Sequence, residues 1–231
     1  MRYCKSTLRM AGEPNKRHST AALLKVTEIF HSIQGESLSV GCPTVFVRLT
    51  GCPMRCTYCD TTYAFTGGNK LSIDEILVKV AKYRTPYVTV TGGEPLAQRA
   101  CWPLLDALVE AGYKVSLETG NAVSIENLNS NVSVVLDIKT PGSGEEPANV
   151  YKNLEWLDAN DQLKFVLCDE DDYQWSRAFL NQHNIVVPVL FSPVWGQLDI
   201  TNLSTWVLRD RLPVRVQTQL HKLIWGEEPG H

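Results

Sequence analysis

Three cysteines lie within eight residues of the chain, in the run Cys52-Pro-Met-Arg-Cys56-Thr-Tyr-Cys59. Structural zinc usually takes four Cys or His ligands in two pairs, but no second pair follows here and the nearest histidine, His31, lies 21 residues upstream. Three thiolates can instead hold three irons of a [4Fe–4S] cube and leave the fourth iron open to another ligand. The spacing therefore favours such a cluster. Zinc, and an electron-transfer cluster completed by Cys42 or Cys101, are the alternatives.

Around the cysteines the chain alternates between apolar runs typical of strands and amphipathic stretches typical of helices. We expect strands at residues 44–50, 87–91, 114–118, 132–138, 162–167, 185–191 and 214–217, and helices at residues 73–83, 96–111, 172–181 and 203–211. Strands this rich in Val, Ile and Leu are typical of a parallel sheet covered by helices, and the repeated order of strand then helix implies right-handed crossovers. These strands are too few for a closed eight-stranded barrel. The sequence therefore predicts an α/β fold with an open, partial TIM-type barrel of parallel strands.

Glycine and polar residues end or directly follow most of the expected strands. They are Gly51-Cys52, Gly92-Gly93-Glu94, Glu118-Thr119-Gly120, Asp137 with Lys139, and Ser192. In a parallel barrel these strand ends all face one mouth, where active sites lie. Ordinary turn chemistry explains each of them singly, but it does not explain three cysteines at one of them.

Composition and charge exclude several classes of protein. With 231 residues, 44% hydrophobic residues and a net charge of −3, the chain is not mainly disordered. Its longest apolar stretch has seven residues, against the ~20 that a membrane span requires. Residues 1–24 carry a net charge of +4 and the rest −7, so the body is too acidic for nucleic-acid binding to be its main function.

We expect residues 1–24 to form a flexible basic extension, and residues 25–231 to form a single domain. The extension has no apolar core of the kind found in secretory signals. Seven cysteines, an odd number, favour free thiols in a reducing compartment, here the cytoplasm.

The cysteine motif resembles that of the radical S-adenosylmethionine (SAM) superfamily, over about residues 25–225. A second match agrees with it: Thr91-Gly92-Gly93-Glu94-Pro95 is similar to the superfamily's GGE motif. The resemblance implies a [4Fe–4S] cluster whose open iron is chelated by the methionyl amine and carboxylate of SAM. Glycine at position 93 allows close backbone approach to that ligand, and Glu94 is expected to accept from its ammonium.

Residues flanking the motif narrow the resemblance. The runs from Glu28 to Glu36, Phe46 to Cys52, Cys59 to Thr61, Leu117 to Gly120, Asp137 to Lys139 and Leu220 to Lys222 are similar to the 7-carboxy-7-deazaguanine synthase family. This implies a lyase that converts 6-carboxy-5,6,7,8-tetrahydropterin to 7-carboxy-7-deazaguanine with release of ammonia, on the route to queuosine. SAM would be cleaved to a 5′-deoxyadenosyl radical and regenerated, and Mg²⁺ would be required.

The same resemblance implies roles for individual residues. Cys52, Cys56 and Cys59 would bind the cluster and Thr61 the Mg²⁺. SAM would contact Tyr58, Asp60, Gly93, Glu94, Glu118, Asp137, Ile138, Lys139 and Ser192. The pterin would contact Ile33, Gln34, Gly35, Glu36, Arg48, Thr91 and His221, with Arg48 suited to its carboxylate. Without these roles, Arg48 would be a paired surface residue, Thr61 a helix N-cap, and His221 a packed imidazole.

Two segments depart from the family pattern. The loop Phe191-Ser-Pro-Val-Trp195-Gly differs from that of many relatives, and the chain continues past His221 to His231.

An alternative function is a radical SAM activase that makes a glycyl radical on a partner protein. The resemblance further implies a homodimer, for which the tryptophan-rich C-terminal third offers a surface, and flavodoxin or ferredoxin as electron donor.

Overall fold

The computed structural model describes residues 22–226, 228 and 230. The expected basic extension lies outside the described residues except for residues 22–24, and Leu23 opens the first strand. Within the described ranges no helix is long and apolar enough to cross a membrane.

One sheet organises the described part of the chain. Its strands are β1 (Leu23–Ile33), β2 (Pro43–Leu49), β3 (Asn69–Ser72), β4 (Tyr87–Gly92), β5 (Lys114–Thr119), β6 (Val132–Ile138), β7 (Gln162–Leu167), β8 (Val189–Pro193) and β9 (Arg215–Val216). They lie in the order β3-β1-β2-β4-β5-β6-β7-β8-β9, and every neighbouring pair from β2 to β9 is parallel. The predicted open array of parallel strands is confirmed.

The sequence prediction overlooked β1 and β3, which add an antiparallel edge to the sheet. In β1, Leu24 and Val26 are buried whereas Leu23 and Lys25 are exposed. This two-residue alternation is typical of a half-buried strand, but the prediction rested on continuous apolar runs. The expected strand at 185–191 also begins later, at Val189, because Pro188 just before it has no N–H to donate to a ladder.

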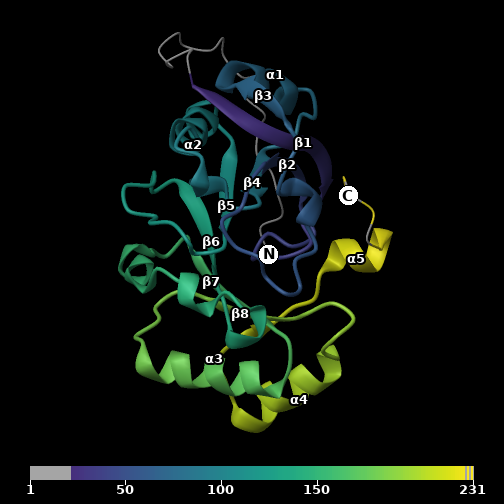
Figure 1. The fold of residues 1–231 in the computed structure, drawn as a ribbon, viewed down its shortest axis with the longest axis vertical. Helices are drawn as coiled ribbons and strands as arrows, with labels where there is room; N and C mark the ends of the chain where they lie inside the picture. The colour runs from purple at the N-terminus through teal and green to yellow at the C-terminus, as the bar shows by residue number, and fades with distance from the viewer. Residues whose placement is uncertain (1–21, 227, 229, 231) are drawn as a thin grey trace, which may run out of the picture.

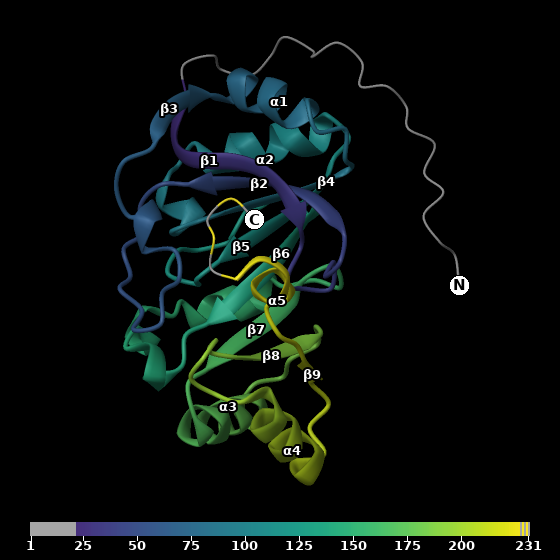
Figure 2. The ribbon, with the colours of Figure 1, turned by 90° about the vertical axis from the view of Figure 1, so that its right-hand side faces the viewer.

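The α-helices are α1 (Ile73–Ala81), α2 (Cys101–Glu110), α3 (Glu170–Gln182), α4 (Ile200–Asp210) and α5 (Leu220–Trp225). The helix expected from residue 96 starts at Cys101, because residues 95–97 form a separate 3₁₀ turn that ends in extended backbone at Gln98. Figure 1 shows α2 on one side of the strands and α5 on the other. Figure 2 shows α5 lying over the middle strands, with α3 and α4 beyond β8.

Two connections of the described chain carry no α-helix, in agreement with the predicted elements, which include none between the strands expected at 114–118, 132–138 and 162–167. No helix joins β5 to β6, and only short 3₁₀ turns, at residues 141–143, 146–148 and 151–156, lie between β6 and β7. Buried asparagines satisfy backbone groups there: the Asn153 side chain accepts from Ile125 N–H at 3.0 Å and donates to Val123 C=O at 2.9 Å. These amide contacts stabilise the loops where a helix would otherwise lie.

The apolar core lies between the sheet and helices α1–α4. Leu104, Leu117, Leu136, Phe165 and Phe191 are all fully buried in it. The other side of the sheet is covered in part by α5, whose first residue donates from Leu220 N–H to Gly35 C=O at 3.0 Å. The site lies on this second side.

Candidate active site

A cavity of about 720 Å³ lies at the carboxyl ends of the parallel strands. Its walls come from the loop after β1, the cysteine loop, the ends of β4 to β7, and α5. All the predicted site residues line it except Gly35, Glu94, Ile138 and Ser192. The volume is in the range of sites that hold small molecules. Because residues of β4, β5, β6 and β7 all line this one cavity, these strands open on one mouth, as expected.

The cysteine loop presents Cys52, Cys56 and Cys59 to this cavity, each partly exposed. Burial raises the pKa of Cys52 and Cys56. The loop is braced from within by Arg55, which donates to Cys52 C=O at 2.9 Å and lies 4.2 Å from the centre of the Phe65 ring. Among the described residues no three His, Cys, Asp or Glu side chains converge on a single-ion site. Three separate thiols facing one cavity are a donor set that fits a cluster.

Unpartnered polar atoms lie beside the cysteines. Tyr58 Oη and Asp137 Oδ1 are buried with no hydrogen-bond partner in the described structure, and the same holds for Ser192 Oγ on β8. Buried polar atoms in folded proteins are almost always paired, and of these three residues Tyr58 and Asp137 line the cavity, so their free oxygens are available to a polar ligand there. Lys139 lies between the first two: its Nζ is 2.9 Å from Asp137 Oδ2 and 5.8 Å from the Tyr58 ring centre. We call the part of the cavity lined by the three cysteines, Tyr58, Asp137 and Lys139 the SAM half, after the cofactor expected there from the sequence.

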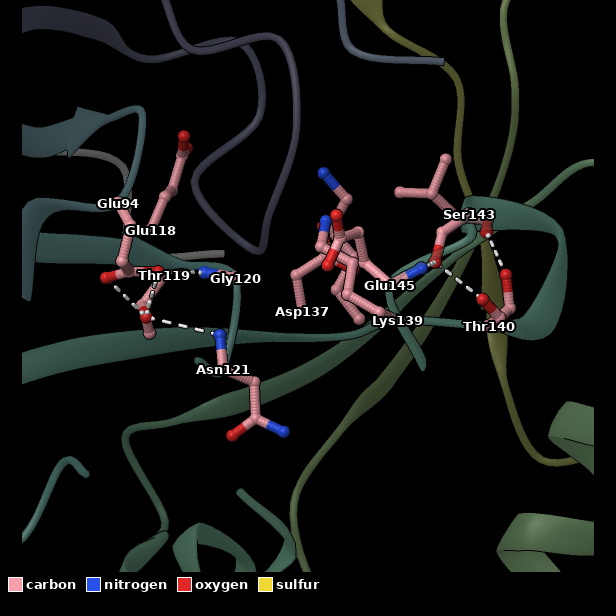
Figure 3. A network of polar contacts seen from close by, with 12 residues as sticks. Glu94, Glu118, Thr119, Gly120, Asn121, Asp137, Lys139, Thr140, Ser143 and Glu145 are labelled. Atoms are coloured by element: carbon pink, nitrogen blue, oxygen red, sulfur yellow. Dashed lines mark hydrogen bonds and ion pairs between the residues drawn. The ribbon is translucent and has the colours of Figure 1, made fainter. Parts of the chain in front are cut away.

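Glu94 lies behind the cavity and is fully buried. Its carboxylate accepts from Leu96 N–H at 3.0 Å, Thr119 Oγ1 at 2.9 Å and Gly120 N–H at 2.7 Å, and Figure 3 shows the contacts to Thr119 and Gly120. In this structure Glu94 therefore braces the ends of β4 and β5. Burial raises its pKa.

The glycine of the same motif has a steric role. A Cβ at Gly93 would lie 2.0 Å from Gly51 C=O, the residue before the first cysteine of the motif. Only glycine lets the end of β4 approach the cysteine loop this closely.

A second group of polar side chains surrounds Glu118. Gln34 Nε2 donates to Glu118 Oε1 at 3.1 Å, and Thr91 Oγ1 donates to Glu118 Oε2 at 3.1 Å. Burial raises the pKa of Glu118. Glu118 was expected among the SAM residues, whereas in the structure it is hydrogen-bonded to two predicted pterin residues.

Lys164, which the sequence analysis missed, lies in this same group. It extends from β7 into the cavity and forms an ion pair with Glu36. Burial alone would raise the pKa of Glu36, but the Lys164 ammonium holds it below its ordinary value. The available signal was one lysine in the middle of an otherwise apolar strand, Gln162-Leu-Lys-Phe-Val-Leu167.

Arg48 lines the cavity and is also paired. Its Nε donates to Glu28 Oε1 at 2.7 Å, and the Tyr63 hydroxyl donates to the same oxygen at 2.8 Å. The guanidinium lies 5.6 Å from the Phe30 ring centre. These contacts with Glu28 and Phe30 hold the Arg48 guanidinium at the cavity wall, where it can bind a carboxylate ligand.

Thr61 stands at the N-cap position of a 3₁₀ turn, but its side chain does not cap that turn. Its hydroxyl instead donates to Asp60 Oδ1 at 2.8 Å, and Asp60 Oδ2 lies 3.0 Å from Lys222 Nζ on α5. Burial alone would raise the pKa of Asp60, but Lys222 holds it well below its usual range. The pair fastens α5 to the cysteine loop.

His221, beside Lys222, is packed against Gly35. A Cβ at position 35 would lie 1.9 Å from His221 Nδ1, and burial lowers the pKa of His221. Gly35 therefore acts by leaving space rather than by lining the cavity.

Substituting Gly35 with alanine should displace His221. Overpacking of this kind costs about 1–3 kcal/mol, so we expect a lower melting temperature and weaker substrate binding. In the double variant Gly35→Ala/His221→Ala the overlap with the ring is gone, and the melting temperature should recover in part. An unchanged melting temperature in Gly35→Ala would show that α5 moves freely.

Comparison with known proteins shows where this site belongs. Residues 46–141 match the family model described as the Radical SAM superfamily. The chain is 44% identical to a 7-carboxy-7-deazaguanine synthase of Chlorobaculum tepidum, over 91% of this chain and 98% of that one. A synthase of the same name from Koribacter versatilis is 41% identical, over 89% and 98%.

A solved structure agrees with the fold. The crystal structure of QueE from Escherichia coli superposes with a TM-score of 0.71 at 22% identity, covering 86% of this chain and 95% of that one. None of these similarities favours the glycyl-radical activase considered above. The chain belongs to the 7-carboxy-7-deazaguanine synthase family of radical SAM enzymes.

Proposed function

We propose that this protein converts 6-carboxy-5,6,7,8-tetrahydropterin to 7-carboxy-7-deazaguanine with release of ammonia, for queuosine biosynthesis. Membership in the family supports the reaction and implies the [4Fe–4S] cluster and SAM. The observation that carries the assignment is the single cavity, which joins the three cysteines to the polar group around Glu118. A cofactor held by the cysteines and a substrate held by the group around Glu118 would lie in one cavity, so the chain would bring their reacting groups together.

The residues of the SAM half would bind the cofactors. Cys52, Cys56 and Cys59 would hold three irons, and Tyr58 and Asp137 would supply their unpartnered oxygens to SAM. When bound, cluster and SAM supply the radical that takes hydrogen from the substrate. The chain's own part there is to orient these groups and to exclude water.

The residues of the other half would position the pterin. Arg48 would bind its carboxylate, while Gln34 and Glu118 offer an amide and a carboxylate to the polar edge of its ring. Glu36, kept ionised by Lys164, would accept from ring N–H groups. His221, with its pKa lowered by burial, would be neutral at pH 7 and able either to donate or to accept.

We further propose Mg²⁺ at Thr61, which lines the cavity two residues after Cys59. Thr61, the substrate carboxylate and water would supply the oxygen ligands that this ion prefers. A reductant for the cluster is implied by the superfamily, and we propose flavodoxin or ferredoxin. We also propose that the protein is a homodimer, on the basis of the family resemblance, and that it is located in the cytoplasm, on the basis of its free thiols.

The proposal is tested by anaerobic turnover. Reconstituted protein with SAM, a reductant and carboxytetrahydropterin should form the deazaguanine product without net loss of SAM. Omitting Mg²⁺ should lower the rate, and Thr61→Val should remove the response to Mg²⁺. Absence of product, together with activation of a glycyl-radical partner, would establish the activase instead.

A further inference from the structure

The loop that carries the three cysteines is hydrogen-bonded to the turn after β6, residues 140–145. Thr57 donates twice to this turn, from its N–H to Ser143 C=O at 3.0 Å and from its hydroxyl to Gly142 C=O at 2.8 Å. Arg55 N–H donates to the Glu145 carboxylate at 2.5 Å. The turn therefore holds two of the residues that lie between Cys52 and Cys59.

The turn in its own right is shaped by local hydrogen bonds. Ser143 Oγ donates to Thr140 C=O at 2.6 Å and accepts from Glu145 N–H at 3.0 Å, and Figure 3 shows both contacts. Gly144, in the left-handed region at φ 73°, ends the 3₁₀ turn and directs Glu145 back toward the cysteine loop.

A single buried carboxylate ties this turn to the rest of the fold. Asp172, in the first turn of α3, is 2% exposed. It accepts from Thr140 Oγ1 at 2.8 Å, from Gly142 N–H at 2.8 Å and from Cys168 N–H at 2.9 Å. A Cβ at Gly142 would lie 2.5 Å from Asp172 Oδ2, so the turn packs directly on this side chain.

We propose that Asp172 is a positioning residue for the iron–sulfur cluster, acting through the 140–145 turn. The inference rests on the proposed function, because it assumes that the cysteines bind a cluster. It assigns a role in the site to a residue that does not line the cavity and lies on a helix outside the sheet. The turn also follows directly after Asp137 and Lys139 in the chain, and Asp172 accepts from its first residue, Thr140.

Asp161 provides a matched control. It is also a buried carboxylate, 4% exposed, and it accepts from Val134 N–H at 2.7 Å and Asp158 N–H at 2.8 Å. It lies at the amino ends of β6 and β7, whereas Asp172 acts at their carboxyl ends. Asp161→Asn and Asp172→Asn each replace one accepting carboxylate oxygen by an NH₂ group. That group then faces N–H donors to which it cannot bond, so both variants should have a lower melting temperature.

The test compares these variants in two forms of the protein. In the reconstituted protein, Asp172→Asn should release iron to a chelator about tenfold faster than wild type, because buried acceptors are lost beneath the loop, and Asp161→Asn should not. In the protein without metal, amide exchange across residues 52–59 should accelerate in Asp172→Asn alone. Equal effects of the two variants on iron release and exchange would overturn the proposal.

A second pair keeps the proposal open to refutation if Asp172→Asn does not fold. Thr57→Val removes the hydroxyl bond to Gly142 and should speed iron release, whereas Thr57→Ser keeps the bond and should restore the wild-type rate. Equal rates in both would again overturn the proposal. Wild-type protein that takes up no cluster would refute the proposed function, and the exchange measurement would still decide whether the turn holds the loop.

Discussion

Replacing Cys56 with alanine should abolish turnover, by at least about a thousandfold, because the cofactor carries the difficult chemistry. Two thiolates cannot hold three corners of a cube, so iron and sulfide contents should fall together with activity. Since Cys56 is partly exposed in a loop, the fold should persist. Circular dichroism and the melting temperature of the metal-free protein should match wild type.

Cys42→Ala is the control for this prediction. Cys42 is also a partly exposed cysteine, but it does not line the cavity. The variant should keep its iron and its activity, and added SAM should still perturb the EPR signal of the reduced cluster. If Cys42→Ala or Cys101→Ala loses the cluster, a fourth cysteine occupies the iron that SAM requires, and the enzyme assignment is wrong.

The second large effect is expected for Lys164→Met. This change leaves the Glu36 carboxylate buried without its cation, and breaking a buried pair in this way costs about 3–5 kcal/mol. Substrate binding should weaken more than SAM binding, because Glu36 belongs to the pterin half. Calorimetric titration with each ligand separates the two.

The stability of Lys164→Met should depend on pH in a different way from that of wild type. In wild type the pKa of Glu36 is lowered, so the pair's stabilisation is present above the ordinary carboxyl range and is lost as the pH falls through the lowered value. Without Lys164, burial should raise the pKa of Glu36, and the folded state then binds more protons than the unfolded state. The variant should therefore become less stable as the pH rises from 5 to 8.

Two further variants check this reading. Glu36→Gln/Lys164→Met removes both charges and should recover most of the stability, though not the substrate affinity. Lys164→Arg retains a cation and should keep both properties in large part. If Lys164→Met shows the same stability at all pH values as wild type, Glu36 does not depend on this ammonium.

The sequence predicted the parallel strands well because their apolar runs are long and end in glycine or polar residues. Strands β2 and β6 match the expected ranges to within one residue at each end. The antiparallel edge was missed because β1 mixes polar and apolar residues, and the helix expected at residue 96 began late because Pro95 opens a separate turn.

The site was predictable where a residue type is tied to one kind of chemistry, as with the three cysteines. It was less predictable where a role depends on neighbours brought together by the fold. Glu94 and Glu118 are both glutamates near the carboxyl end of a strand, yet Glu94 accepts from backbone N–H groups behind the cavity whereas Glu118 lines it. Lys164 could be recognised only once Glu36, 128 residues away in sequence, was found beside it.

The ion pair between Asp60 and Lys222 has a thermodynamic consequence. Asp60 lies between Cys59 and Thr61, while Lys222 is next to His221 in the wall of the pterin half. Iron bound at Cys59 should restrict the motion of Asp60, and through the ion pair that of Lys222 and the neighbouring His221. Bound iron should therefore raise the affinity for the pterin. By linkage, bound pterin must then raise the equilibrium affinity for iron by the same factor, so substrate-saturated enzyme should hold its iron at a higher chelator concentration than enzyme without substrate.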